Sequence, residues 1–413
     1  KIRMVGGSGK DHFLNEGDAG RLFVYDVNFE ENKFSGNENG LRKKITSDPQ
    51  NNMYNRLYYR YNFINPGVSI SYNIDDGLYL GAKLETTIHG FRKDPYKSHQ
   101  FIRANRALGT SSFRFTYQGE FIKSIGNADL LIDADVRAPI NVTNFFGLGN
   151  NTVFDKTKPG RIRYYRARYD IADFSALLRR RLQSWMRVTY GLTYQYYRVE
   201  EKQNIGKFLT QPGLPGVNRA TLYDHKSFVG AQLGLDINSK NNQAVPSRGF
   251  VLDAGFRPLV GMGNSNRLTQ THLDMRLFAS FKQTARLVYA IRVGGGHNFG
   301  DYEFPQAQYL GGTDNLRGYR KDRFAGRSML YNNTEVRLKI ADFNTYLFPG
   351  SFGLFVFNDV GRVWAGNETE VDWHVGNGGG IWLSPVRRFV VTAAYTRSKE
   401  ERGLPLVTFG FQF

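Results

Sequence analysis

The stretch "VTYGLTYQYYRV" (residues 188–199) decides the fold. Apolar or aromatic side chains occupy every second position, at Val188, Tyr190, Leu192, Tyr194 and Tyr196. Successive side chains of a β-strand point to opposite faces, whereas a helix repeats its apolar positions every three or four residues. The stretch therefore predicts a strand with one apolar and one polar face.

The same alternation recurs along most of the chain. Reading residues 161–181 as one long, bulged strand gives 16 strands, whereas splitting this segment gives 17, and bacterial single-chain barrels have even numbers. The predicted strands are 67–74, 78–90, 100–108, 112–122, 128–138, 161–181, 185–199, 226–237, 249–259, 267–282, 285–298, 330–341, 351–363, 375–385, 387–398 and 404–413.

The connections between these strands fall into two groups. Long ones lie at 139–160, 200–225, 299–329 and 364–374, and short ones such as "KQTAR" (282–286) and "SPVRR" (384–388) lie at the other end. Outer-membrane barrels have long surface loops and short periplasmic turns. We therefore predict an all-β fold, a 16-stranded antiparallel transmembrane β-barrel over residues 67–413. A soluble β-protein is the alternative, but its sheets usually have fewer strands.

Composition fits this fold class. The 413 residues include 32 Phe, 24 Tyr and 45 Gly, which suits strands joined by tight turns. The longest apolar run, 389–395, is far below the ~20 residues of a membrane-spanning helix. Cysteine is absent, so the chain has no disulfides. The net charge of +18 is spread over strands and loops, which favours contact with anionic lipids over nucleic-acid binding.

Residues 1–66 differ from the rest, and we interpret them as an N-terminal periplasmic segment and linker. "GGSGKDHF" (6–13) matches the turn that binds calcium in stacked parallel β-helices, with Gly7, Gly9 and Asp11 as its motif residues. Only one copy is present, and such sites need a neighbouring repeat. An ordinary glycine-rich turn before a strand at 21–27 is the alternative. The polar segment 30–52 is predicted to be a linker.

Three motifs near the end of the chain resemble one family. Leu316-Arg317-Gly318-Tyr319 looks like the (V/I/L)-R-G-(F/Y) signature in the sixth surface loop of the BamA-type outer-membrane assembly and two-partner-secretion superfamily, also known as surface antigen D15-like barrels. "NNTEVRLKI" (332–340) and "FVFNDVGRVW" (355–364), which contains Asp359 and Gly361, resemble that family's strands 12 and 13. The resemblance implies a 16-stranded barrel in the outer membrane of a Gram-negative bacterium.

The resemblance also implies a role for the sixth loop. It places the loop inside the barrel lumen, with Arg317 meeting Glu335 and Asp359 on strands 12 and 13. Arginine suits an anchor because its planar fork can hold two carboxylates. Gly318 would allow close backbone approach, and Tyr319 would pack on the inner wall. A surface loop with a solvated arginine is the alternative.

Two further features follow the same resemblance. The final "TFGFQF", with Phe409, Phe411 and Phe413, resembles the C-terminal signal of outer-membrane barrels, or it is simply the lipid-facing row of the last strand. The first strand, 67–74, is short, which by analogy favours a seam between strands 1 and 16 that opens sideways as a lateral gate.

Other basic residues of the sixth loop lack such a role. Arg320, Lys321, Arg323 and Arg327 are interpreted as solvated positions of a basic loop, rather than as contacts for anionic sugars or a substrate.

The sequence contains no recognisable catalytic motif. There is no HExxH, phosphate-binding loop or G-x-S-x-G elbow, so we expect no enzyme activity, cofactor or metal centre in this segment beyond the calcium turn. Some family members carry a patatin-like lipase or phosphoesterase domain in place of the βααββ POTRA modules, and residues 1–66 show no such module.

Three functions remain open at this point. The barrel inserts or translocates polypeptides, it anchors or exports its own upstream domain, or it is an anion-preferring diffusion porin. The partners that we expect are outer-membrane lipids including lipopolysaccharide, and a polypeptide substrate or accessory envelope proteins.

Overall fold

The computed structural model describes residues 2–17, 21–53, 60–73, 77–263, 266–281, 285–346, 348–366 and 372–413. The chain forms two compact units. One comprises residues 1–63 with 87–97, and the other comprises residues 64–86 with 98–413. The predicted domain boundary at residue 66 lies close to the first of these divisions.

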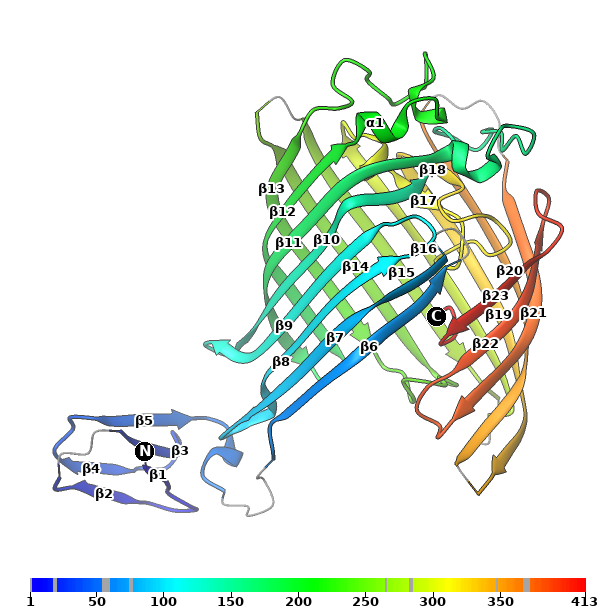
Figure 1. Ribbon diagram of the computed structural model, residues 1–413. Helices are drawn as coiled ribbons and strands as arrows, with labels where there is room; N and C mark the ends of the chain where they lie inside the picture. Colours follow the sequence, from blue (N-terminus) through cyan, green and yellow to red (C-terminus); the bar gives the residue numbers. More distant parts are fainter. Residues whose placement is uncertain are drawn as a thin grey trace. The chain divides into compact units, whose positions relative to one another are not determined.

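The main sheet contains 16 strands in the described part of the chain, with neighbours in sequence order from β6 to β23, and it curves round on itself (Figure 1). All pairings recorded between its strands are antiparallel, as predicted. The strands are β6 (Phe63–Asn73), β7 (Gly77–Gly90), β8 (Lys93–Ala107), β9 (Phe113–Ile125), β10 (Ala128–Asn144), β11 (Arg166–Gln183), β12 (Met186–Val199), β13 (Lys226–Asn238), β14 (Gly249–Gly261), β15 (Arg267–Ala279), β16 (Leu287–Gly300), β19 (Ser328–Asn344), β20 (Pro349–Trp364), β21 (His374–Pro385), β22 (Val391–Ser398) and β23 (Leu404–Phe409).

Burial along these strands is inverted relative to a soluble protein. On β19, Glu335 and Arg337 are buried whereas Leu338 and Ile340 are exposed. On β20, Asp359 is buried, and Phe352, Leu354 and Val356 are 40–58% exposed. On β19 and β20 the charged side chains therefore face inward, together with Phe355 and Phe357, and a row of apolar side chains faces outward, as in a barrel surrounded by lipid.

Strand positions follow the prediction, but several ends are corrected. The first strand is not the short segment 67–74, because β6 starts at Phe63 and has 11 residues, so strand length does not support the predicted lateral gate. β8 starts at Lys93 rather than at 100, β10 ends at Asn144 rather than at 138, and β22 starts at Val391 rather than at 387. The strand predicted to begin at 161 starts at Arg166, because residues Arg161–Tyr165 form the 3₁₀ helix η3. The last strand ends at Phe409 rather than at residue 413. The predicted ends at residues 74 and 282, part of the "KQTAR" turn and residues 367–371 lie outside the described residues.

The N-terminal unit corrects the linker prediction. Its short strands β1 (Ile2–Val5), β3 (Leu22–Val27) and β5 (Leu41–Thr46) pair in parallel, and β2 (His12–Asn15) pairs in parallel with β4 (Lys33–Gly36). Segment 30–52 therefore contains two strands and the 3₁₀ helix η1 (Pro49–Asn51). The strand predicted at 21–27 is β3.

This parallel stack has its own small core. Phe13, Leu22, Val24 and Val27 are buried, and the Phe13 and Phe34 rings stack with centroids 5.1 Å apart. Each turn of chain therefore places its apolar residues above those of the previous turn, as in a β-solenoid.

The connections of the main sheet carry short elements. The loop between β12 and β13 contains α1 (Glu201–Asn204) and η4 (Phe208–Thr210). Residues 301–327 contain η5 (Phe304–Gln306), β17 (Gln308–Leu310) and β18 (Phe324–Gly326), and β17 pairs with β18. None of the helices in the described residues is long and apolar enough to cross a membrane.

Candidate functional site

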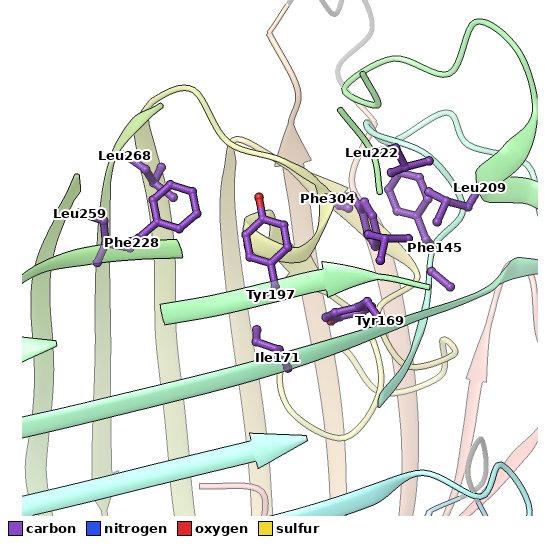
Figure 2. Packing of buried hydrophobic residues seen from close by; sticks show 13 residues of the cluster. Phe145, Tyr169, Ile171, Tyr197, Leu209, Leu222, Phe228, Leu259, Leu268 and Phe304 are labelled. Atoms are coloured by element: carbon purple, nitrogen blue, oxygen red, sulfur yellow. The ribbon is translucent and has the colours of Figure 1, made fainter. Parts of the chain in front are cut away.

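Residues 301–327, between β16 and β19, form the candidate site, and we call them the inner loop. The loop joins two apolar clusters. Figure 2 shows the first, in which Phe304 lies beside Phe145, with ring centroids 5.1 Å apart, and the cluster extends to buried side chains of β11 to β15. That cluster consists of Phe145, Ala167, Tyr169, Ile171, Tyr197, Val199, Leu209, Leu222, Phe228, Leu259, Leu268, Phe304 and Ala325.

The second apolar cluster lies beside β19 and β20. It consists of Leu310, Leu316, Tyr319 and Phe324 of the loop, with Tyr331 of β19 and Val363 of β20. Because the two clusters involve different stretches of the sheet, the inner loop connects strands that are not neighbours. Burial of this much apolar surface fixes the position of the loop against the polar, inward row of the strands.

Arg317 occupies the tip of the inner loop and is 3% exposed. Its Nε donates to Asp359 Oδ2 and its Nη2 to Asp359 Oδ1, both at 2.7 Å. The backbone N–H of Arg317 donates to the same carboxylate at 3.0 Å. Nη1 donates to Glu335, and the guanidinium carbon lies 3.5 Å from the centre of the Phe357 ring. The structure therefore places Arg317 between the two carboxylates that the sequence analysis assigned to it.

A second arginine extends this contact. Arg337 Nε donates to Glu335 Oε2 at 2.7 Å, so Glu335 accepts one arginine on each carboxylate oxygen. The side chains of Arg317, Glu335, Arg337 and Asp359 are all at most 3% exposed. Two positive and two negative charges thus form a neutral cluster out of water, where paired charges interact strongly and an unpaired one is costly.

The remaining motif residues bring the loop backbone close to the wall. Gly318 has φ +90°, and its carbonyl accepts a hydrogen bond of 2.6 Å from Ser398 of β22. A β-carbon on Gly318 would lie 2.8 Å from the carbonyl oxygen of Arg397, so glycine is needed both for conformation and for space. Tyr319 is buried, and its ring packs at 5.4 Å from Phe324.

Leu316 and Gly361 complete the predicted set. Leu316 is fully buried in the second apolar cluster. Gly361 of β20 pairs with Tyr331, and a β-carbon there would lie 2.9 Å from the methyl carbons of Leu310. The strand glycine thus makes room for a leucine of the inner loop.

Arg323 contradicts the solvated-loop interpretation. It is 1% exposed, and its guanidinium donates to Glu400 Oε1 at 2.6 Å and Oε2 at 2.8 Å. The same group donates to Thr152 Oγ1 at 2.7 Å and lies 4.7 Å from the centre of the Phe146 ring. Sequence reasoning missed this anchor because Arg323 and Glu400 lie 77 positions apart with no shared motif.

Two other basic residues of the group also have partners. Arg320 forms an ion pair of 3.4 Å with Glu401, and Arg327 donates to the carbonyl oxygen of Gly300 at 2.6 Å. Lys321 contributes its carbonyl oxygen, which accepts from Asn144 at 2.9 Å.

A further anchor on β16 was also missed. Arg292 Nε donates to Asp274 Oδ2 and Arg292 Nη1 to the carbonyl oxygen of Asp314 in the inner loop, both at 2.6 Å. Tyr331 OH donates to the same Asp274 oxygen at 2.7 Å. The loop tip is therefore held from β16 as well as from β19 and β20.

The three final phenylalanines do not share one face, contrary to a simple lipid-facing row. Phe409 is 83% exposed, whereas Phe413 is 8% exposed and packs with Val251, Phe278 and Ala290. The Phe411 ring lies under the Arg337 guanidinium at 3.9 Å. Because β23 ends at Phe409, the residues after it turn to the inward side.

A cavity of about 180 Å³ lies beside the anchor. It is lined by Thr313, Arg317, Glu335, Phe355, Thr392, Leu406, Thr408, Phe411 and Gln412. The inner loop, the final residues and the two last strands therefore meet around one space.

The predicted calcium turn lies in the N-terminal unit, away from this site in sequence. Gly7 and Gly9 have φ of +101° and +110°, as a tight glycine turn requires, and Asp11 follows directly before β2. Among the described residues, no three His, Cys, Asp or Glu side chains are grouped to hold a metal ion.

Comparisons with known proteins place the large unit in a family. The model of the Omp85 superfamily domain matches residues 62–413. BamA from Haemophilus ducreyi lacking POTRA domains 1–3 is similar in structure, with TM-score 0.59 and 13% identity over 91% of this chain and 73% of that one.

Two CdiB structures are also similar. CdiB from Escherichia coli gives TM-score 0.53 at 11% identity, and CdiB from Acinetobacter baumannii gives 0.50 at 16%. Each match covers 84% of this chain, which spans 61% and 59% of those two chains, respectively. No curated protein matches in sequence. At such identities these structures support the fold, and the family model over residues 62–413 supplies the assignment: the chain belongs to the Omp85 superfamily.

Proposed function

We propose that this chain is an outer-membrane barrel that inserts or translocates polypeptides, with the inner loop closing its lumen at rest. The observation that carries the proposal is the buried contact of Arg317 with Asp359 and Glu335. Such an anchor gives the loop one fixed position, and its loss would free a segment long enough to clear a passage.

The outward apolar row supports the location in the outer membrane. Phe352, Leu354 and Val356 present a continuous apolar surface on β20, which acyl chains of lipid would cover. The net charge of +18 adds attraction to anionic head groups, including those of lipopolysaccharide.

The anchored loop argues against a diffusion porin, and single-channel conductance in planar bilayers tests this. We expect the native chain to be nearly closed and Arg317→Ala to give large, noisy openings. Arg320→Ala is the matched control, because it removes one charge from the same loop at a partly exposed position. A native pore that stays open and ignores Arg317→Ala would favour the porin.

A second candidate is that the barrel anchors or exports its own N-terminal region. The parallel strands β1 to β5 favour it, because this unit is not the βααββ module of the assembly factors. The two candidates separate in cells that carry only Arg317→Ala. Polypeptide handling predicts that other outer-membrane or secreted proteins decrease in the proteome, whereas self-anchoring predicts that only this chain is affected.

A further inference from the structure

The N-terminal unit stacks two turns of chain that the sequence analysis did not connect. Val5 of β1 pairs with Tyr25 of β3, and the N–H of Gly6 donates to the carbonyl oxygen of Tyr25 at 3.1 Å. The motif turn at 6–11 therefore lies against the following turn at 26–32. This second turn lacks the glycines of the motif but begins with Asp26 and contains Glu30.

Two carboxylate oxygens in these turns have no donor. The Asp26 side chain is fully buried, and its Oδ1 accepts from the N–H of Val27 at 2.8 Å. Asp26 Oδ2 and Asp11 Oδ2 are both buried and make no hydrogen bond within the described residues. Buried carboxylate oxygens are normally paired, so two unpaired ones side by side indicate a missing positive partner.

Asp11 Oδ2 and Asp26 Oδ2 both lie close to the position that a β-carbon of Gly6 would take. A β-carbon on Gly6 would lie 2.5 Å from Asp11 Oδ2 and closer still to Asp26 Oδ2. The φ of Gly6 is outside the left-handed region, so another residue could adopt the backbone there. What the glycine provides is open space between two carboxylates.

The charges around Asp26 also favour a positive partner at this point. Burial is the main cause that raises the pKa of Asp26, and the charges of Asp11 and Glu30 raise it further, while the Val27 N–H and the amide of the Asn52 side chain offset only part of the rise. A divalent cation between the two oxygens would remove this repulsion, and calcium prefers a shell of carboxylate, backbone carbonyl and water oxygens.

We propose that Asp11 and Asp26 bind one calcium ion beside Gly6, between the first two turns of the N-terminal unit. The motif "GGSGKDHF" thus finds its neighbouring repeat in the next turn of the stack. Two side chains frame the site: Glu30 Oε1 accepts from the N–H of Gly9 at 3.1 Å, and Asn52 Nδ2 donates to the carbonyl oxygen of Gly7 at 2.6 Å. Calcium is favoured over magnesium because a flexible shell of this kind tolerates irregular geometry.

Equilibrium dialysis with radioactive calcium tests the proposal on the full chain, refolded in detergent without lipopolysaccharide and kept in excess magnesium. We expect one calcium ion per chain, and at least a tenfold weaker affinity in Asp11→Asn and in Asp26→Asn. Gly6→Ala should weaken binding to a similar extent while keeping every charge, because its methyl group occupies the cation position. Glu38→Gln is the control, since Glu38 is exposed and pairs with Lys43 in the same unit.

A second measurement covers the case in which a variant misfolds. In the wild-type chain, hydrogen exchange of the peptides that contain β1 to β3 should slow by at least tenfold when calcium replaces EDTA, while the β12 peptide stays unchanged. Absence of calcium binding by the wild type in excess magnesium, or equal binding by the wild type and all variants, would overturn the proposal.

Discussion

Arg337 connects the inner-loop anchor to Phe413. Its Nε donates to Glu335 Oε2 at 2.7 Å, and its Nη2 donates to the carbonyl oxygen of Phe413 at 2.9 Å. Since Glu335 also accepts from Arg317, one chain of charge-assisted hydrogen bonds runs from the loop tip through β19 to the residues after β23. The position of the loop and the position of these final residues are therefore energetically linked.

We predict from this link that Arg337→Ala releases the final residues. The sequence has no cysteine, so Gln412→Cys gives a single thiol at a position beside the cavity. Its reaction with a membrane-impermeant maleimide should become several-fold faster when Arg337 is replaced by Ala. Val407→Cys, on the exposed face of β23, is the control and should not respond. Equal rates at residue 412 in both backgrounds would show that Arg337 does not hold this segment.

Arg317→Ala should destabilise the loop more than any other single truncation in it. Removing one partner of a buried ion pair costs ~3–5 kcal/mol, because the carboxylates of Asp359 and Glu335 remain buried and unpaired. Limited trypsin digestion followed by mass spectrometry should show new cleavage at Lys321. The double variant Arg317→Met with Asp359→Leu removes one charge of each sign and should recover part of the protection. Cleavage at Lys321 in the wild type at the same rate would refute the anchor.

Arg323→Ala should loosen the other end of the same loop. It leaves Glu400 without its bidentate partner, and it removes the hydrogen bonds to Thr152. We expect faster hydrogen exchange in β18 and in the peptide around Thr152, with little change around Asp359. A response confined to the Asp359 region would mean that the two anchors are not separate.

Gly318→Ala should cost about 1–3 kcal/mol, the usual range for a strained backbone conformation, plus the clash with Arg397. Gly213 offers a matched comparison, because its φ is +76° and open space surrounds it. Urea denaturation in detergent should therefore show a larger loss of stability for Gly318→Ala than for Gly213→Ala. The difference between them measures the close approach of the loop to β22, and similar losses would exclude a crowding effect.

The stability of the N-terminal unit should depend on pH through Asp26. Its pKa is raised above the ordinary 3.8, so just above pH 3.8 the folded state keeps a proton that the unfolded chain has released. The free energy of unfolding therefore falls as pH rises from 3.8 through the folded-state pKa, and stays lower above it. To measure this dependence, the chain is unfolded in urea and EDTA at a series of pH values. The unfolded fraction at each pH is then read from the β3 peptide by a hydrogen-exchange pulse at one fixed pH. Asp26→Asn should abolish the Asp26 contribution to this slope.

Much of the main sheet was predictable because its information is local. A strand such as β12 shows the alternation within its own sequence, and turn residues mark its ends. The predicted range 185–199 therefore agrees closely with the observed strand, Met186–Val199. The start of β11 was misplaced because "RIRYY" alternates like a strand but forms η3, which brings Tyr165 against Phe146.

The N-terminal stack was not predictable in the same way. Strands such as β4 contain four residues, and their partners lie far along the chain, so no window shows a period. The same reason hid the Arg323–Glu400 contact and the Arg337–Phe413 contact, which join residues 77 and 76 positions apart. The Arg317 contacts were accessible only because three motifs resembled a known family.

The neutrality of the anchor has a consequence for the surroundings in which it works. Ionic strength weakens attraction between charges that water separates, but it hardly reaches charges held in a dry interior. The four side chains of Arg317, Glu335, Arg337 and Asp359 sum to zero and are almost fully shielded. The contacts of Arg317 with Asp359 and Glu335 should therefore change little as the ionic strength of the surroundings changes.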